Sequence, residues 1–366
     1  MKPVAFFVHH QGRGHANRTR AILAELPPSR PVTILTADPS LFDGVDRKIE
    51  MIPLPNMIGA PSRTPALFAA PTPEVMHCVP LGVEAQRTHM ATIAQTLDRI
   101  DPALFVIDVS AEIALLARIL SVPAIKIRMH GDRLDPGHLA AYQACPLLLA
   151  PFDEVLEQDD YPDWARAKTF YSGGLCTTEA DVPEQMDARR ALGIEEERRV
   201  VVVMTGGGGS GTPYAPLTMA ARAEPDTQFL VVGPVHREGH ETDFANLELR
   251  GWVNNVTDYI AAADAVIASA GDNTVHEIAR LGRPYLCAPE WRYFDEQARK
   301  ADELERLGAA VALRAWPGSL SAWRDAFARA GTLDLKALKK LYDADAARKI
   351  AAWLENGAAR LWSASS

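Results

Sequence analysis

The residues best suited to chemistry stand at two strand-to-helix corners in the second half of the chain. One corner covers residues 251–256 and the other covers residues 270–277, each after a predicted strand. Helix N-termini attract anions, and in an open parallel sheet both corners reach the carboxyl edge, where ligands bind. Glu277, about one turn into a helix expected to begin at Asn273 or Thr274, is placed to accept hydrogen bonds from a sugar diol. Two ordinary turns with a solvated glutamate are the alternative.

A glycine-rich segment follows the predicted strand 200–204. Residues 205–212 read Thr-Gly-Gly-Gly-Gly-Ser-Gly-Thr. Glycine has no Cβ to block a ligand, so this loop can turn several backbone N–H groups toward one phosphate. The segment has neither the Gly-Lys-Ser/Thr of a P-loop nor the spacing of a dinucleotide fingerprint. We therefore predict a phosphate contact, with a plain linker as the alternative.

A second loop with glycines, at residues 9–18, joins the first predicted strand to the first predicted helix. His15 stands at the start of that helix. An unperturbed histidine has a pKa of about 6.5, which suits proton abstraction at neutral pH. A histidine that only caps or packs against the helix is the alternative. Arg18 and Arg20 add positive charge for an anionic acceptor, or are solvated helix residues.

Polar residues also follow two predicted strands of the first half. Asp108 comes directly after the apolar run 104–107, and His130 and Asp132 come after the strand that begins at Ala124. These carboxylate and imidazole groups are suited to binding or deprotonating an acceptor hydroxyl. The alternative for Asp108 is an N-cap, a common role for aspartate before a helix.

Composition narrows the class of protein. The chain has 366 residues, of which 48% are hydrophobic and 23% charged, which is typical of a soluble globular protein with room for two domains. A formal net charge of −9 argues against a nucleic-acid binder. Four widely spaced cysteines predict neither a zinc site nor a disulfide framework. With neither a signal peptide nor an apolar run of about 18 residues, we expect a cytoplasmic protein.

Both halves of the chain alternate apolar runs, predicted to be strands, with segments of helical periodicity. The predicted strands cover residues 4–8, 32–36, 104–109, 124–129, 147–150, 200–204, 228–232, 247–250, 265–269, 285–288 and 309–313. Continuous apolar strands indicate parallel sheets covered on both faces. We therefore predict an α/β protein with two Rossmann-like, doubly wound domains that face a central cleft. The tail after residue 334 has the periodicity of one or two amphipathic helices.

The run 251–310 resembles the C-terminal domain of family 28 glycosyltransferases of GT-B fold, a family that includes the transferase that forms lipid II for peptidoglycan. The resemblance implies that Trp252 and Val253 frame a uracil. The family's Ser-Gly-x-x-Thr-Val-x-Glu segment holds the diphosphate and ribose. Here Ala270 replaces its serine, and the matching residues are Gly271, Asp272, Asn273, Thr274 and Glu277.

Three further matches are implied by the same resemblance. The family's glycine-rich loop before the donor diphosphate corresponds to Gly208, Gly209 and Ser210. Its Gly-x-Gly-Gly-His loop corresponds to Gly12, Arg13, Gly14 and His15, with arginine in place of one glycine, and implies acceptor binding there together with Asp132. Its Asp-x-Gln-Gln-x-x-Asn-Ala pattern, which contacts the donor sugar, corresponds to Glu296 and Gln297, while the asparagine is lost.

The resemblance implies an inverting glycosyltransferase that uses a nucleotide sugar, most simply a UDP-sugar, without a metal or cofactor. Its acceptor would be a cell-envelope glycan, a lipid-linked intermediate or a small molecule. His15 is our first choice for the base, before Asp108 and His130. A sugar-nucleotide hydrolase and a non-catalytic nucleotide-sugar binder are the alternatives.

The expected domains are residues 1–175 for the acceptor, 176–334 for the nucleotide sugar, and 335–366 as helices that return to the first domain. The proline-rich, apolar segment 51–80 is expected to be a long ordered loop. By resemblance it would contact a lipid acceptor or a membrane surface, which makes peripheral membrane binding one expectation. A packed surface loop is the alternative, because the segment lacks the basic residues that membrane contact favours.

Overall fold

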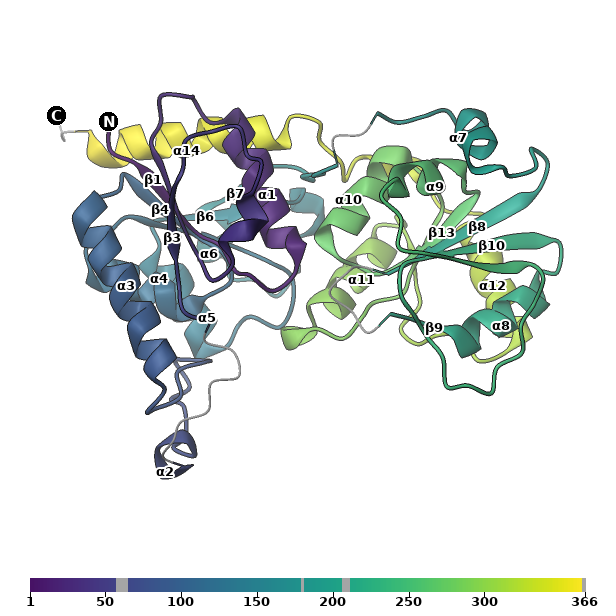
Figure 1. Cartoon of the computed structure of the whole chain (residues 1–366), viewed down its shortest axis with the longest axis horizontal. Coiled ribbons are helices and arrows are strands. Elements are labelled where there is room, and N and C mark those ends of the chain that lie inside the picture. The colour runs from purple at the N-terminus through teal and green to yellow at the C-terminus, as the bar shows by residue number, and fades with distance from the viewer. Residues whose placement is uncertain (57–64, 179–180, 206–210, 364–366) are drawn as a thin grey trace. The chain divides into compact units, whose positions relative to one another are not determined.

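The computed structural model describes residues 1–56, 65–178, 181–205 and 211–363. The chain forms two compact units (Figure 1). Unit 1 consists of Met1–Pro151, Asp159–Ser172 and Asp345–Ser366, and unit 2 consists of Phe152–Gln158 and Gly173–Ala344. Each unit is a parallel sheet with helices, so the prediction of two Rossmann-like α/β domains is confirmed.

Unit 1 is built on a seven-stranded parallel sheet in the order β3-β2-β1-β4-β5-β6-β7. Its strands are β1 (Val4–Phe7), β2 (Val32–Thr36), β3 (Glu50–Pro53), β4 (Leu104–Ile107), β5 (Ala124–Ile127), β6 (Leu147–Ala150) and β7 (Thr169–Tyr171). Its helices are α1 (Arg13–Glu25), α2 (Pro65–Phe68), α3 (Glu84–Ile100), α4 (Ala111–Ile119), α5 (Pro136–Ala144), α6 (Asp163–Arg166) and α14 (Ala346–Trp362), with the 3₁₀ turn η1 (Pro39–Phe42). Leu97 of α3, Ile113 of α4 and Tyr142 of α5 join Phe105 of β4 in one buried cluster. This cluster covers one face of the sheet, and Phe6 and Val106, which point to the other face, are buried as well, so the central strands lie in the interior.

Unit 2 is built on a six-stranded parallel sheet in the order β12-β10-β8-β13-β14-β15, beside a two-stranded sheet of β9 and β11. Its strands are β8 (Arg199–Met204), β9 (Thr212–Pro213), β10 (Thr227–Val232), β11 (Val235–His236), β12 (Leu247–Gly251), β13 (Ala265–Ala268), β14 (Tyr285–Cys287) and β15 (Val311–Ala312). Its helices are α7 (Gln185–Leu192), α8 (Tyr214–Ala223), α9 (Val256–Ala262), α10 (Asp272–Leu281), α11 (Glu296–Arg306), α12 (Leu320–Ala330) and α13 (Leu335–Lys339), with the 3₁₀ turns η2 (Glu154–Leu156) and η3 (Tyr293–Asp295). Trp323 of α12 is fully buried with Leu217 of α8 and Phe229 of β10, which packs these helices on one face.

Each sheet has a switch point, where the chain order of the strands reverses. In unit 1 it lies between β1 and β4, which pair in parallel with Phe7 opposite Ile107. In unit 2 it lies between β8 and β13, which pair with Val203 opposite Ile267. The loops that leave such a pair of strands turn toward opposite faces and open a crevice at the carboxyl edge. Both switch points are therefore where candidate ligand sites are expected.

Several elements differ from the sequence-based expectations. The segment 51–80 contains the end of β3 and the short α2, rather than loop alone. Strands β7, β9 and β11 were not expected, because their two or three residues are too short to show a pattern. Asp108 is not the N-cap of α4, because Ser110 Oγ accepts the hydrogen bond from the N–H of Ile113 at 3.2 Å.

The division of the chain also differs from the expected ranges. The short segment Phe152–Gln158 clusters with unit 2. Of the two tail helices, α13 packs against α10 in unit 2, while α14 packs against α1 in unit 1. Arg30 Nε donates to Glu355 of α14 at 2.7 Å, and Trp362 Nε1 donates to the carbonyl of Ala103 at 2.9 Å. Within the described residues, no helix is both long enough and apolar enough to cross a membrane.

The docking of α14 supplies a test of the fold. Leu354 of α14 is fully buried, whereas Leu361 of the same helix is 38% exposed. Leu354→Ala should lower the free energy of unfolding by about 2–5 kcal/mol, because it removes buried methyl groups and leaves a cavity. Leu361→Ala is the matched control and should change it by less than about 1 kcal/mol. Urea titrations of both variants measure the difference, and equal losses would show that α14 is not docked as described.

Candidate functional site

The switch point of unit 1 brings His15 and Asp108 together. His15 lies in the first turn of α1, which follows β1, and Asp108 directly follows the neighbouring strand β4. His15 Nδ1 is 2.7 Å from Asp108 Oδ2, and Arg18 Nη2 donates to Asp108 Oδ1 at 2.8 Å. The sequence suggested His15 and Asp108 as alternative bases, but the structure makes them partners. Arg18 is buried on Asp108, so the expectation of a solvated or acceptor-binding Arg18 is wrong.

Electrostatics keep Asp108 ionised in this buried position. Burial alone would raise the pKa of Asp108, but Arg18, His15 and Lys126 hold it well below its usual range. Asp108 Oδ2, at 2.7 Å, lies closer to His15 Nδ1 than Arg18 Nη2 does, at 3.2 Å, so the carboxylate places the imidazole proton on Nδ1 and leaves Nε2 as the basic nitrogen. The His15 side chain is 18% exposed and that of Asp108 only 2%, so another molecule can reach the imidazole but not the carboxylate. This arrangement suits a general base whose imidazole is oriented by a carboxylate.

A second histidine borders the pair. The His9 ring centroid lies 5.8 Å from that of His15. Burial, together with the neighbouring His15, lowers the pKa of His9 to about 4, although Asp108 opposes this shift. His9 is therefore neutral at physiological pH, and it adds no positive charge beside His15.

The other residues expected on the acceptor side lie around the same sheet edge. Gly12 has φ of 80°, a left-handed conformation that favours glycine, and it precedes the exposed Arg13 and Gly14 of α1. His130 and Asp132 lie in the loop after β5. His130 is only 2% exposed, and Arg133 Nε donates to its carbonyl at 2.9 Å. Its burial makes His130 a poorer candidate base than His15.

Three further side chains near the starts of α4 and α5 form a cluster that the sequence did not indicate. Asp135 Oδ1 lies 2.5 Å from His77 Nε2, and its Oδ2 lies 2.5 Å from His138 Nδ1. Ligand atoms of the three lie close enough to hold a metal ion. However, Arg133 Nη1 lies 3.1 Å from His138 Nε2, which places the His138 proton on Nδ1, toward Asp135. Glu112 also accepts from the N–H of His77 at 2.7 Å, so these contacts anchor the loop between α2 and α3 that carries His77.

In unit 2 the expected donor residues lie around the starts of α9 and α10. Trp252, at the corner between β12 and α9, is 68% exposed and can stack on a base. Glu277 of α10 is 5% exposed, and its Oε1 accepts from Thr257 Oγ1 of α9 at 2.8 Å. Burial raises the pKa of Glu277. Thr257 thus orients the carboxylate whose expected role is to bind ribose.

The start of α10 carries a buried ion pair. Gly271 is the N-cap and Asp272 the first residue of α10, and Asn273 and Thr274 complete its first turn. Lys300 of α11, in the place of the family's asparagine, pairs with Asp272. The side chain of Lys300 is 2% exposed, so its charge is neutralised within the protein. The helix N-terminus remains the element suited to a diphosphate.

Gln297 connects the two loops that border this helix start. Its Oε1 accepts from the N–H of Ala270, after β13, at 3.1 Å and from the N–H of Glu290, after β14, at 2.8 Å. The amide oxygen of Gln297, a residue expected to contact the donor sugar, therefore accepts from two backbone N–H groups. Glu296 precedes it as the first residue of α11. Gly208, Gly209 and Ser210 lie outside the described residues.

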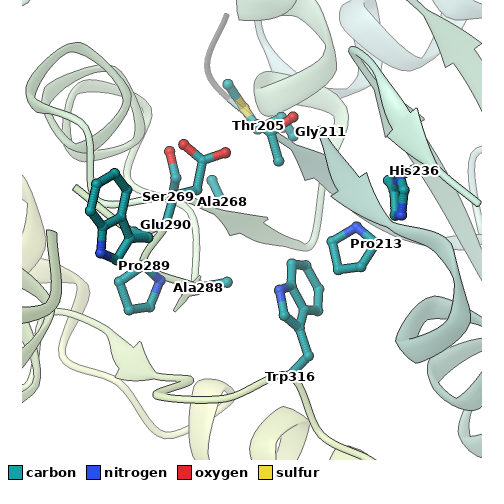
Figure 2. A pocket seen from close by; sticks show the side chains of 12 residues that line it. Thr205, Gly211, Pro213, His236, Ala268, Ser269, Ala288, Pro289, Glu290 and Trp316 are labelled. Atoms are coloured by element: carbon teal, nitrogen blue, oxygen red, sulfur yellow. The ribbon is translucent and has the colours of Figure 1, made fainter. Parts of the chain in front are cut away.

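A pocket of about 250 Å³ lies at the switch point of unit 2 (Figure 2). Its lining comes from the ends of β8, β13 and β14, from the β9–β11 pair, and from Trp316. The lining residues are Met204, Thr205, Gly211, Pro213, His236, Ala268, Ser269, Ala288, Pro289, Glu290, Trp291 and Trp316. The sequence did not indicate this pocket, because its walls come from six separate segments.

The depressed pKa of Asp108 makes a prediction for stability against pH. An unfolded aspartate titrates at about pH 4, so ionised Asp108 stabilises the fold above this pH, and the contribution is lost as the pH falls toward the lower folded pKa. Asp108→Asn should lower the free energy of unfolding near neutral pH, and its gap to the parent should narrow below about pH 4. Urea titrations across this range measure the gap.

The control is Asp101→Asn. Asp101 is 69% exposed in a surface pair with Lys2, and such pairs contribute little. A gap for Asp108→Asn that stays constant with pH would contradict an ionised Asp108.

Comparison with known proteins relates part of unit 2 to a known family. Residues 218–316 match the glycosyltransferase family 28 C-terminal domain. Two curated UDP-N-acetylglucosamine–N-acetylmuramyl-(pentapeptide) pyrophosphoryl-undecaprenol N-acetylglucosamine transferases are similar. The one from Sorangium cellulosum is 36% identical over 92 residues, which cover 22% of this chain and 23% of the relative. The one from Caldicellulosiruptor saccharolyticus is 25% identical over 230 residues, which cover 59% and 60%. The chain thus matches less than two thirds of either relative's length.

Solved structures extend the likeness to nearly the whole chain. The glycotransferase of kitacinnamycin has a TM-score of 0.67 at 17% identity, with 97% of this chain and 99% of that chain covered. MurG from Acinetobacter baumannii has a TM-score of 0.65 at 14% identity, with 97% and 100% covered. Spinosyn rhamnosyltransferase SpnG complexed with thymidine diphosphate has a TM-score of 0.60 at 18% identity, with 98% of each chain covered. At such identities the likeness concerns the fold, which is GT-B. The chain therefore has the GT-B fold, and its residues 218–316 match the glycosyltransferase family 28 C-terminal domain, with similarity to the lipid II-forming transferases.

Proposed function

We propose that this chain is an inverting glycosyltransferase that moves a sugar from a nucleotide donor, in the first instance a UDP-sugar, to a hydroxyl acceptor. The observation that carries the proposal is the His15–Asp108 pair at the switch point of unit 1, in a chain whose second unit holds a family 28 domain. An accessible imidazole bound to an ionised carboxylate is suited to deprotonating a hydroxyl.

In this mechanism unit 1 supplies the proton acceptor. His15 Nε2 takes the proton of the acceptor hydroxyl while its oxygen attacks C1 of the donor sugar from the face opposite the leaving group. The bond between C1 and the diphosphate oxygen breaks, and its electron pair leaves with the nucleotide. Asp108, 2.7 Å from Nδ1, stabilises the imidazolium that forms. Arg18 keeps that carboxylate ionised.

Unit 2 supplies the donor site in the same proposal. The diphosphate lies at the N-terminus of α10, where free N–H groups stabilise the charge that develops on departure. Glu277, oriented by Thr257, accepts hydrogen bonds from the ribose hydroxyls. Trp252 stacks on the base. Because Asp272 is neutralised by Lys300, its carboxylate does not oppose the diphosphate with a full charge.

The proton acceptor is tested by His15→Ala. Loss of a general base should lower kcat by about 100- to 10,000-fold, while nucleotide affinity should remain, because the donor site belongs to unit 2. Nucleotide release from a panel of nucleotide sugars, with and without cell-envelope lipid or small-molecule acceptors, measures both kcat and the apparent affinity for the donor. His240→Ala, at a side chain that is 70% exposed, is the control.

Each outcome distinguishes a class of function. Release only in the presence of an acceptor supports transfer, whereas equal release without one indicates a hydrolase. Binding of a nucleotide sugar, without turnover of any nucleotide sugar in the panel, indicates a non-catalytic binder. A His15→Ala variant that loses acceptor affinity but keeps kcat would show that another group is the base.

The donor nucleotide is tested by thermal protection and by Glu277→Ala. UDP should raise the melting temperature more than ADP, GDP or TDP, because ligands that bind the folded state stabilise it by mass action. Glu277→Ala should weaken UDP binding by about 1.5–3 kcal/mol, the contribution of a charged hydrogen-bond acceptor. Glu238→Ala is the control, since Glu238 is 63% exposed. Stronger protection by TDP would overturn the uridine assignment and leave the fold unaffected.

A further inference from the structure

Two buried side-chain oxygens at the pocket of unit 2 have no hydrogen-bond partner among the described residues. These are Glu290 Oε1, after β14, and Thr205 Oγ1, after β8. A polar atom buried without a partner costs about 1–3 kcal/mol, and a ligand hydroxyl in the pocket would supply the missing partner. Figure 2 shows Glu290, Thr205 and Trp316 around the same hollow.

Glu290 is held in one orientation. Its Oε2 accepts from Arg292 Nη2 at 2.7 Å, and its backbone N–H donates to Gln297 Oε1 at 2.8 Å. Glu290 is therefore held at its backbone and at Oε2, with Oε1 left to accept from a ligand. An ionised carboxylate only accepts hydrogen bonds, so the matching ligand group is a donor, such as a hydroxyl.

The walls and size of the pocket indicate a sugar ring. Trp291, which is 72% exposed, and Trp316 provide indole surfaces for the apolar face of a ring. A space of about 250 Å³ is smaller than ordinary drug-sized sites of about 300–1,000 Å³. It therefore suits one hexose rather than a whole nucleotide sugar.

The pocket also adjoins the elements proposed to hold the diphosphate. Gln297 Oε1 accepts from both Glu290 and Ala270, and Ala270 immediately precedes the N-cap of α10. Thr205 immediately precedes the glycine-rich run. Gln297 thus links the loop that carries Glu290 to the loop that leads into α10.

We infer that this pocket binds the donor's sugar ring, with Glu290 accepting hydrogen bonds from neighbouring hydroxyls, and that it selects neutral hexoses over uronic acids. The inference rests on the proposed function and extends it to the sugar. Glu290 adds a sugar contact to those that the sequence assigned to Glu296 and Gln297, and the oxygen of Gln297 positions the loop of Glu290. The carboxylate of a uronic acid offers only hydrogen-bond acceptors and cannot donate to Glu290 Oε1, which is the source of the selectivity.

The test compares Glu290→Gln with the parent by calorimetry, using UDP, UDP-glucose, UDP-N-acetylglucosamine and UDP-glucuronate, or the same sugars on the nucleotide that the parent binds best. Affinity for the neutral nucleotide hexoses should fall by about 10- to 100-fold, as for a lost charged hydrogen bond. Affinity for the free nucleotide should not change. Discrimination against the uronate should shrink.

A second variant guards against misfolding. Thr205→Val keeps the side-chain shape and removes the unpaired hydroxyl, so it should not lower the melting temperature but should weaken binding of the nucleotide hexose. Glu238→Gln, at an exposed side chain, is the control. If Glu290→Gln binds the nucleotide hexose as the parent does, the sugar pocket is wrong while the transferase proposal stands. If the parent binds no nucleotide sugar at all, both fail.

Discussion

The parallel pairing of β1 with β4, and of β8 with β13, is the constraint on which the rest of the structure depends. Parallel strands that pair in register end at the same edge, and at these two pairs the chain order reverses. The loop after β1 and the loop after β4 therefore meet, although many residues separate them in sequence. This backbone geometry, rather than any local motif, puts His15 within 2.7 Å of Asp108.

Buried charge is handled in the same way in both units. Asp108 is compensated by Arg18 and His15, and Asp272 is compensated by Lys300 from a different helix. Removal of one partner from such a group is costly, because it leaves an uncompensated buried charge. Each pair also fixes a functional element. The first orients the proposed base, and the second joins the start of α10 to α11.

In unit 2, residues of the segment that corresponds to the family's Asp-x-Gln-Gln-x-x-Asn-Ala pattern position the neighbouring loops. The amide oxygen of Gln297 joins the loops after β13 and β14 through two backbone N–H groups. Glu290 Oε1, by contrast, borders the pocket as a buried acceptor without a partner among the described residues. The change from asparagine to Lys300 has a structural partner as well, since the lysine pairs with Asp272. These departures from the family pattern thus have structural partners in one region, around α11 and the start of α10.

The sequence alone determined the two α/β units and the loops that carry the candidate residues. The periodicity of strands and helices is a local feature that a few neighbouring positions reveal. The same is true of residues at or near the loops, such as His15, Gly271 and Glu277. Only the tertiary structure decided which of them are partners. In the tertiary structure His15 and Asp108, which the sequence offered as alternative bases, contact each other. Arg18 is buried there in an ion pair with Asp108. These outcomes depend on strand order and on which polar atoms remain unpaired after packing, and a linear pattern contains neither.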